Sequence, residues 1–216
     1  MKKLNINSQA WMAIGITVAI LLIDQILKIW VKTHMTLHEM LTITSWFKIC
    51  FVENNGMAYG MEFGSKLLLS LFRIILVGFI GVFLFRQFGK NRFKKGFLIC
   101  VTMIFAGALG NIIDGMFYGL IFNASSAHYV SYLVPFGEGY APFLMGKVVD
   151  MFYFPLIVTT YPDWVPVWGG QPFVFFSPVF NFADSCISVG VVLLLLFYRK
   201  EVGKLTWDSR NKTEKA

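Results

Sequence analysis

Long apolar runs separated by short polar stretches dominate the hydrophobic pattern of this chain. Four runs are long enough to cross a bilayer as helices, at about 10–31, 67–85, 96–119 and 182–199. The second would extend about 28 Å at a rise of 1.5 Å per residue, close to the thickness of the hydrocarbon core. The first could instead be a cleavable signal peptide, but no small-residue cleavage site follows its apolar core, so we expect a retained span. The pattern predicts an α-helical polytopic membrane protein with four transmembrane helices, forming a single membrane domain over 1–216.

The composition agrees with this class. Of the 216 residues, 56% are hydrophobic and only 14% are charged, which excludes an ordinary soluble domain. The net charge of +7 could indicate a nucleic-acid partner, but the basic residues lie between and outside the apolar runs, so we expect none. The cysteines Cys50, Cys100 and Cys186 form no paired framework, and we interpret them as core residues.

Basic residues predict the orientation of the spans. Five of them, with no acid, occupy the short connection between the second and third runs, namely Arg86, Lys90, Arg92, Lys94 and Lys95. By the positive-inside rule this connection is cytoplasmic, which places both termini in the cytoplasm as well. The longer connections, about 32–66 and 120–181, then face outward.

Polar residues inside the runs gather at one predicted depth, near the outer surface. They are Asp24 and Lys28, Asn111 and Asp114, and Asn181 and Asp184. The spacing of Asp24 and Lys28 allows them to pair on one helix face. Asn181 and Asp184 have a second interpretation, as a helix N-cap and an acid that complements the helix dipole. Ionisable residues in a membrane are costly, so the shared depth favours a common polar site.

The two outward connections carry different patterns. Residues 42–63 are too short and polar to cross the bilayer, and their β-branched and aromatic residues are broken by Asn54-Asn55-Gly56. This pattern predicts two short strands around a turn. The second connection places Asp150 before an aromatic cluster and continues with a mixture of prolines and tryptophans. Such a mixture suits a loop on the bilayer surface or a short amphipathic helix.

Five motifs in this order resemble those of the bacterial lipoprotein signal peptidases, or signal peptidase II, over about 15–200. They are Asp24-x-x-x-Lys28, Asn54-x-Gly56-x-Ala58-Tyr59, Gly107-Ala-Leu-Gly110-Asn111-x-x-Asp114, Val148-Val149-Asp150-Met-Phe and Phe180-Asn181-x-Ala183-Asp184-x-x-Ile187. The resemblance implies four transmembrane helices, a small outer β-cradle and a periplasmic helix over the active site. It also implies a membrane aspartyl protease that cuts a signal peptide just before a diacylglyceryl-modified cysteine.

The resemblance also implies roles for individual residues. Asp150 and Asp184 match the catalytic pair, a choice that spacing alone leaves open against Asp114 or Asp24. Positions that line or brace the site are matched by Asn54, Gly56, Asn111, Asp114 and Asn181, and a supporting polar pair by Asp24 and Lys28. Amide hydrolysis by two carboxylates needs no metal or cofactor, and we expect none. We expect a monomer in the bacterial inner (cytoplasmic) membrane that acts on prolipoproteins beside membrane lipids, with its active site toward the periplasm.

The chain departs from the family pattern at two residues and in two segments. Gly115 follows Asp114 and Glu53 precedes Asn54, where the family usually has arginine, and the outer segments 120–146 and 155–179 are longer than usual. Gly115 motivates one alternative, an inactive relative of the peptidase. A small transporter or ion carrier would also place acids in membrane helices, although internal repeats would then be expected.

Overall fold

The structure is a computed structural model that describes residues 8–54, 66–90 and 92–205. Backbone contacts divide the chain into two compact units. The helical unit comprises Met1–Gln25, Gly64–Ile113 and Phe182–Ala216, and the sheet unit comprises Ile26–Phe63 and Asp114–Asn181. The expected single membrane domain stays a prediction.

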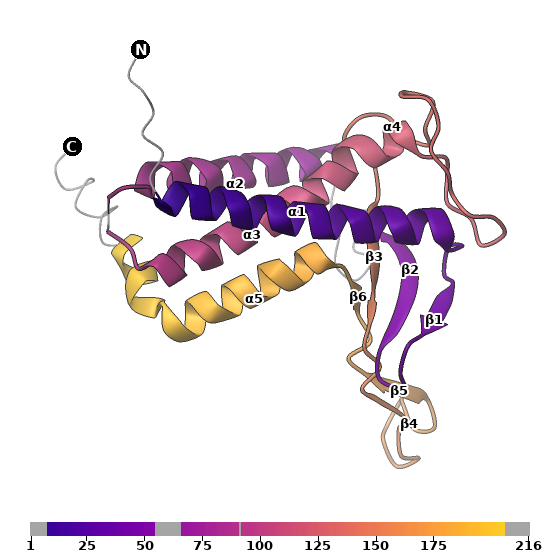
Figure 1. Ribbon diagram of the computed structural model, residues 1–216. Coiled ribbons are helices and arrows are strands. Elements are labelled where there is room, and N and C mark those ends of the chain that lie inside the picture. Colours follow the sequence, from indigo (N-terminus) through magenta and orange to yellow (C-terminus); the bar gives the residue numbers. More distant parts are fainter. Residues whose placement is uncertain (1–7, 55–65, 91, 206–216) are drawn as a thin grey trace. The chain divides into compact units, whose positions relative to one another are not determined.

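Four apolar helices contribute to the helical unit, namely α1 (Ser8–His34, up to Gln25), α2 (Lys66–Gln87), α3 (Lys95–Ile113) and α5 (Phe182–Phe197) (Figure 1). All seven prolines lie between residues 135 and 178, so none interrupts these helices. Three helices are long and apolar enough to cross a membrane: α1, α2 and the continuous helix Lys95–Ile121. A fourth candidate span is obtained if α5 and the helical segment Arg199–Leu205 are counted as one broken span; the angle between the two is 93°. The four apolar runs are therefore confirmed as helical, and the described residues contain three to four candidate spans.

Small residues let α3 and α5 pack closely. A Cβ atom at Gly190 would lie 2.8 Å from Cγ1 of Ile104 and 2.9 Å from the carbonyl oxygen of Cys100. Close approach through small residues is the usual way in which membrane helices associate. By contrast, α2 exposes large side chains such as Phe72 and Phe79, the face that a lipid-contacting helix presents.

One end of the helical unit gathers three segments that are distant in sequence. The backbone N–H of Gly89 donates to the side chain of Gln9 over 3.3 Å, and Nη2 of Arg92 donates to the carbonyl oxygen of Lys204 over 3.3 Å. The connection between α2 and α3 therefore lies beside the start of α1 and beside the segment that follows α5 (Figure 1).

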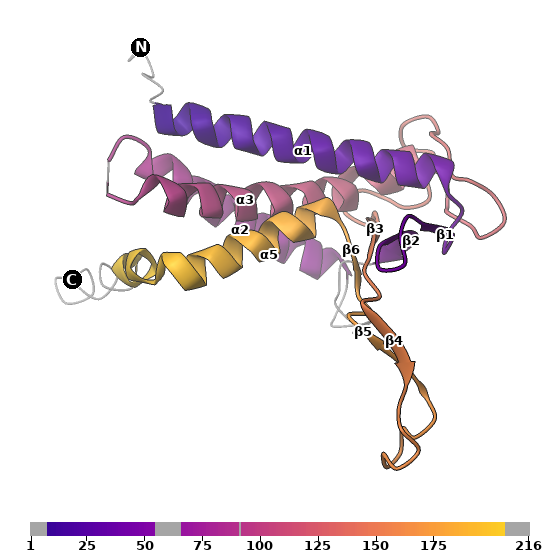
Figure 2. The same ribbon diagram turned by 60° about the horizontal axis from the view of Figure 1, so that its bottom comes forward.

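A four-stranded antiparallel sheet forms the centre of the sheet unit, in the order β1-β2-β3-β6 (Figure 2). Its strands are β1 (Met40–Thr42), β2 (Lys48–Asn54), β3 (Val148–Tyr153) and β6 (Val179–Phe180). A bulge in β2 lies between Ile49 and Val52. Two strands in the segment 42–63 were expected around Asn54-Asn55-Gly56. Strand β2 ends at Asn54, and the rest of that turn lies outside the described residues.

Thr44 stabilises the turn between β1 and β2, which the sequence analysis did not predict. The hydroxyl of Thr44 accepts the N–H of Phe47 over 3.0 Å, and the N–H of Thr44 donates to the carbonyl oxygen of Phe47 over 2.9 Å. Strand β2 then continues to Asn54, which pairs with Val148 of β3. Gly56 lies outside the described residues.

The second outward connection contains a hairpin where a short amphipathic helix was one expectation. After the π-helical turn η2 (Asp114–Tyr118) and the short α4 (Gly119–Ile121), no helix occurs in 122–181, which the structure describes in full. Strand β4 (Ile157–Thr160) instead pairs with β5 (Pro172–Phe175). The expected helix is wrong because β4 is built from two β-branched apolar residues and two threonines, which favour an extended backbone.

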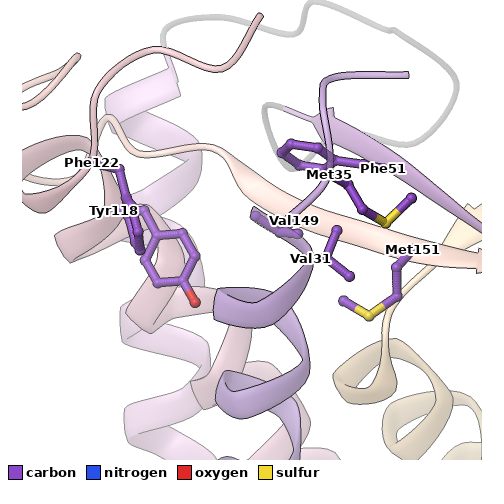
Figure 3. Packing of buried hydrophobic residues seen from close by; sticks show 7 residues of the cluster. All are labelled: Val31, Met35, Phe51, Tyr118, Phe122, Val149 and Met151. Carbon is purple, nitrogen blue, oxygen red and sulfur yellow. The ribbon is translucent and has the colours of Figure 1, made fainter. Parts of the chain in front are cut away.

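The apolar core of the sheet unit fixes strand β3 against the end of α1. Seven buried side chains from four segments form it: Val31, Met35, Phe51, Tyr118, Phe122, Val149 and Met151 (Figure 3). Val149 and Met151 point into this core on either side of Asp150 in sequence. Because side chains alternate along a strand, Asp150 is directed away from the core.

Candidate active site

Two amide side chains hold the carboxylate of Asp150 within the sheet unit. Its Oδ1 accepts the Nδ2–H of Asn181 over 2.7 Å, and its Oδ2 accepts the Nδ2–H of Asn54. Strand pairing places all three residues: Asp150 lies opposite Val52 in β2, and Asn181 follows β6, the other neighbour of β3. Asp150 is 3% exposed and Asn181 is fully buried. Three residues that the sequence nominated therefore meet at one carboxylate.

A second carboxylate, Asp184, lies in the helical unit, in the first turn of α5. Its Oδ1 accepts the Nδ2–H of Asn111 on α3 over 2.8 Å. An acid in the first turn also complements the positive end of the helix dipole. The sequence interpretation of Asp184 as a dipole-complementing acid and its interpretation as a site residue are thus compatible.

Asp24 ties α1 to the start of α5 in the helical unit. Its Oδ1 accepts the backbone N–H of Ala183 over 3.0 Å, a group that otherwise has no partner at a helix start. Its Oδ2 accepts the amide of Gln25 over 3.2 Å, and Gln25 also donates to the carbonyl oxygen of Gly110 over 3.3 Å. Asp24 therefore supports the two helices that carry Asn111 and Asp184. Its expected pairing with Lys28 stays a prediction.

Lys28 and Asp114 form a fully buried ion pair in the sheet unit. Their Nζ and Oδ2 atoms lie 2.8 Å apart, and neither side chain is exposed. The same Oδ2 accepts the backbone N–H of Val149 over 3.5 Å. Asp114 begins the π-helical turn η2, an irregularity that is frequent at functional sites. The pair therefore braces the residue that precedes Asp150.

A buried charge cluster beside Asn54 was missed by the sequence analysis. Nζ of Lys32 lies 2.5 Å from Oε1 of Glu53, and the hydroxyl of Ser125 donates to the same oxygen over 2.8 Å. Lys147 approaches the other oxygen of Glu53 at 3.4 Å. Burial alone would raise the pKa of Glu53, but the charges of Lys32 and Lys147 and the hydrogen bonds outweigh it and lower that pKa.

The spacing of charged residues along α1 could have identified Lys32 as a site residue. Asp24, Lys28 and Lys32 follow one another at intervals of four residues, so they share one face of α1. Aromatic rings of Phe122 and Tyr140 lie 5.2 Å from Nζ of Lys32, which adds cation–π attraction to the ion pair. Ser125 and Tyr140 carry no comparable pattern in sequence.

Gly146 lets the η2 turn approach the start of β3. The N–H of Gly146 donates to the carbonyl oxygen of Gly115 over 2.9 Å. A Cβ at Gly146 would collide with the carbonyl oxygen of Asp114, whereas a Cβ at Gly115 would meet nothing nearer than 4.0 Å. The backbone at Gly115 therefore leaves room for a side chain, and Gly146 does not.

Among the described residues, no three His, Cys, Asp or Glu side chains are grouped to hold a metal ion.

Comparisons with known proteins agree on one family. A family model described as Signal peptidase (SPase) II matches residues 16–199. A protein of Porphyromonas gingivalis named lipoprotein signal peptidase is 52% identical over 191 residues, covering 88% of this chain and 84% of that protein. A protein of Amoebophilus asiaticus with the same name is 36% identical over 202 residues, covering 91% of this chain and 81% of that protein.

The fold also has a solved counterpart. A structure described as a bacterial membrane enzyme, determined by the in meso method at 2.3 Å resolution, superimposes with a TM-score of 0.57. The two chains are 24% identical, and the match covers 89% of this chain and 90% of the other. At this identity the likeness concerns the fold alone.

Proposed function

Because the chain belongs to the signal peptidase II family, we propose that it is an aspartic endopeptidase that removes signal peptides from diacylglyceryl-modified prolipoproteins, cutting just before the modified cysteine. Family membership favours this function over a transporter or ion carrier. The observation that carries the catalytic assignment is the hydrogen bonding of Asp150, whose two carboxylate oxygens each accept an asparagine amide.

In the proposed mechanism Asp150 and Asp184 act together on one water molecule and one peptide bond. Two N–H donors favour the ionised carboxylate, so Asp150 serves as the base that takes a proton from the water. Asp184 enters protonated and donates its proton to the carbonyl oxygen as the water oxygen bonds to the carbonyl carbon. The tetrahedral intermediate then collapses: the C–N bond breaks, the leaving nitrogen gains the proton held by Asp150, and Asp184 regains one from the hydroxyl group.

The remaining site residues position these two acids. Asn54 and Asn181 orient Asp150, and Asn111 orients Asp184. Asp24 fixes the start of α5, while Lys28 and Asp114 fix the backbone before Asp150. A reacting pair of acids needs such support, because small displacements of catalytic groups lower the rate strongly.

We also assign four transmembrane spans, cytoplasmic termini and an active site on the periplasmic side of the inner membrane. The basic connection between α2 and α3 marks the cytoplasmic side by the positive-inside rule. Its contacts with Gln9 and Lys204 support placing both termini on that side. The acyl chains of the substrate would stay in lipid, and one copy of the chain would suffice for cleavage.

The test is cleavage of a purified diacylglyceryl-modified prolipoprotein by the detergent-solubilised protein, with an unlipidated substrate as control. Cleavage of the lipidated substrate alone is the expected result, with mass spectrometry locating the cut before the modified cysteine. A folded protein that cleaves neither substrate would identify an inactive relative. Ion flux through reconstituted vesicles without cleavage would identify the transporter.

A further inference from the structure

An apolar hairpin projects from the sheet unit over residues 156–176, built on β4 and β5. Ile157 and Val158 are neighbours in β4, so their side chains lie on opposite faces of the ribbon. They are nevertheless 55% and 68% exposed. A two-stranded ribbon in water is at best marginally stable, and antiparallel sheets usually bury one apolar face. A ribbon that exposes apolar side chains on both faces requires an apolar or interfacial surrounding.

The tip of this hairpin carries three prominent apolar side chains. Trp164 is 81% exposed, Val167 is 85% exposed and Trp168 is 55% exposed. Val167 adopts a φ of 74°, a backbone conformation that β-branched residues avoid. Asp163 is the only charged residue in 156–176. The tip is therefore suited to apolar and aromatic contact and has no basic residue for binding an anionic surface.

Contacts between aromatic rings connect the hairpin to the sheet. At its base, Phe180 of β6 contacts Phe154 at 5.7 Å and Phe176 at 6.0 Å between ring centroids. Within the hairpin, the ring of Tyr161 lies 5.0 Å from that of Phe173. The exposed tip is thus presented by a braced element.

The direction of the hairpin indicates which surface it contacts. In both views the ribbon runs crosswise to the end of α1, which belongs to the same unit (Figures 1 and 2). Since α1 is long and apolar enough to span the bilayer, a ribbon crosswise to its end runs along the membrane surface. Tryptophan is enriched at this level because its ring is apolar and its N–H can still bind water or headgroups.

We propose that the hairpin of residues 156–176 docks into the outer interface of the lipid bilayer, with Trp164, Val167 and Trp168 as its anchors. The contact is apolar, so binding does not require anionic lipid. It fixes the orientation of β3 and β6, the strands that carry Asp150 and lead to Asn181, at the level where a lipidated substrate would emerge from the outer leaflet.

Spin labelling in proteoliposomes tests the docking directly and needs no catalytic activity. A nitroxide is attached to Val167→Cys in the full chain reconstituted in phosphatidylcholine, and its accessibility to oxygen and to a water-soluble nickel chelate is measured. The expected depth is about 5–10 Å below the phosphates, as for other interfacial elements. The matched control is Glu138→Cys, an exposed charged position in the same unit, where access of the nickel chelate is expected to be greater. The unmodified chain gives the background, since Cys50, Cys100 and Cys186 are buried.

A second variant separates anchoring from folding. Trp164→Ser combined with Trp168→Ser is expected to raise the Val167→Cys label toward water without lowering the unfolding temperature, because both rings are largely exposed. Equal nickel access at Val167 and Glu138, or an unchanged depth in the double variant, would overturn the docking. Dipolar broadening that disappears on dilution with unlabelled protein would assign the hairpin to a second copy of the chain instead.

Discussion

Replacing Glu53 by Gln removes the negative charge from the buried cluster beside Asn54. The side chain of Glu53 is 2% exposed, and that of its partner Lys32 is fully buried. Loss of one partner leaves a buried charge without compensation, which costs about 3–5 kcal/mol. In a chain of this size we expect the unfolding temperature to fall by about 6–20 °C. The measurement is thermal unfolding of the purified protein in detergent.

Two further variants test the physical reason for this loss. Lys147 also contacts Glu53 but its side chain is 41% exposed, so Lys147→Met is expected to cost about 0–1 kcal/mol. The double variant Glu53→Met with Lys32→Met removes both charges together, and it should cost much less than the sum of the single losses. A cost of Glu53→Gln below that of Lys147→Met, or strict additivity in the double variant, would refute the reasoning.

The same carboxylate predicts a pH dependence. Although burial opposes ionisation, the charge of Lys32 lowers the pKa of folded Glu53 below its ordinary value of 4.5. The stabilisation is therefore fully present above the unfolded pKa and is lost as the pH falls through the folded pKa. We expect the stability difference between the wild type and Glu53→Gln to be constant above about pH 5 and to shrink below it. A difference that grows on acidification would contradict this assignment.

Three other substitutions have defined outcomes. Asn181→Ala should lower kcat by about 10- to 150-fold, since a hydrogen bond to a charged group, as Asp150 is in the proposed mechanism, is worth about 1.5–3 kcal/mol. An unchanged turnover rate would oppose this role. Gly146→Ala should give no folded peak in detergent gel filtration, because a Cβ at this position would collide with backbone atoms. Gly115→Ala should elute as the wild type does, because a Cβ there would meet nothing nearer than 4.0 Å. Asp24→Ala should lower the free energy of unfolding by about 0.5–2 kcal/mol, because the start of α5 loses its cap. Asp24→Asn keeps an acceptor oxygen, so thermal unfolding should show most of the wild-type stability.

The helices were predictable from the sequence because their signal is local. Each apolar run is uninterrupted by proline, and the bounds of α2 and of the continuous helix Lys95–Ile121 lie within a few residues of those expected. The turn between β1 and β2 was not predicted, because residues 43–47 lack the Asn-Gly signal present at Asn54-Asn55-Gly56. Thr44 stabilises an earlier turn, and the pairing of Asn54 with Val148 extends β2 through a contact that is distant in sequence.

The sequence nominated candidate site residues, but it could not predict the hydrogen bonds between them. Motif matching nominated Asn54 and Asn181, yet only strand pairing reveals that both donate to Asp150. Lys32 and Ser125 escaped notice because a cation at a helix end and a loop serine are common features. Their significance lies in the buried Glu53, whose partners come from α1 and from the segment after α4.

The proposed catalytic pair is tested most directly by three matched substitutions assayed on a lipidated prolipoprotein. Asp150→Asn and Asp184→Asn should each abolish cleavage while leaving the protein folded, because asparagine keeps the shape of the side chain. Asp163→Asn makes the same chemical change at the exposed tip of the hairpin and should leave cleavage unchanged. Substantial cleavage by either of the first two variants would contradict the assignment of Asp150 and Asp184 as the catalytic acids.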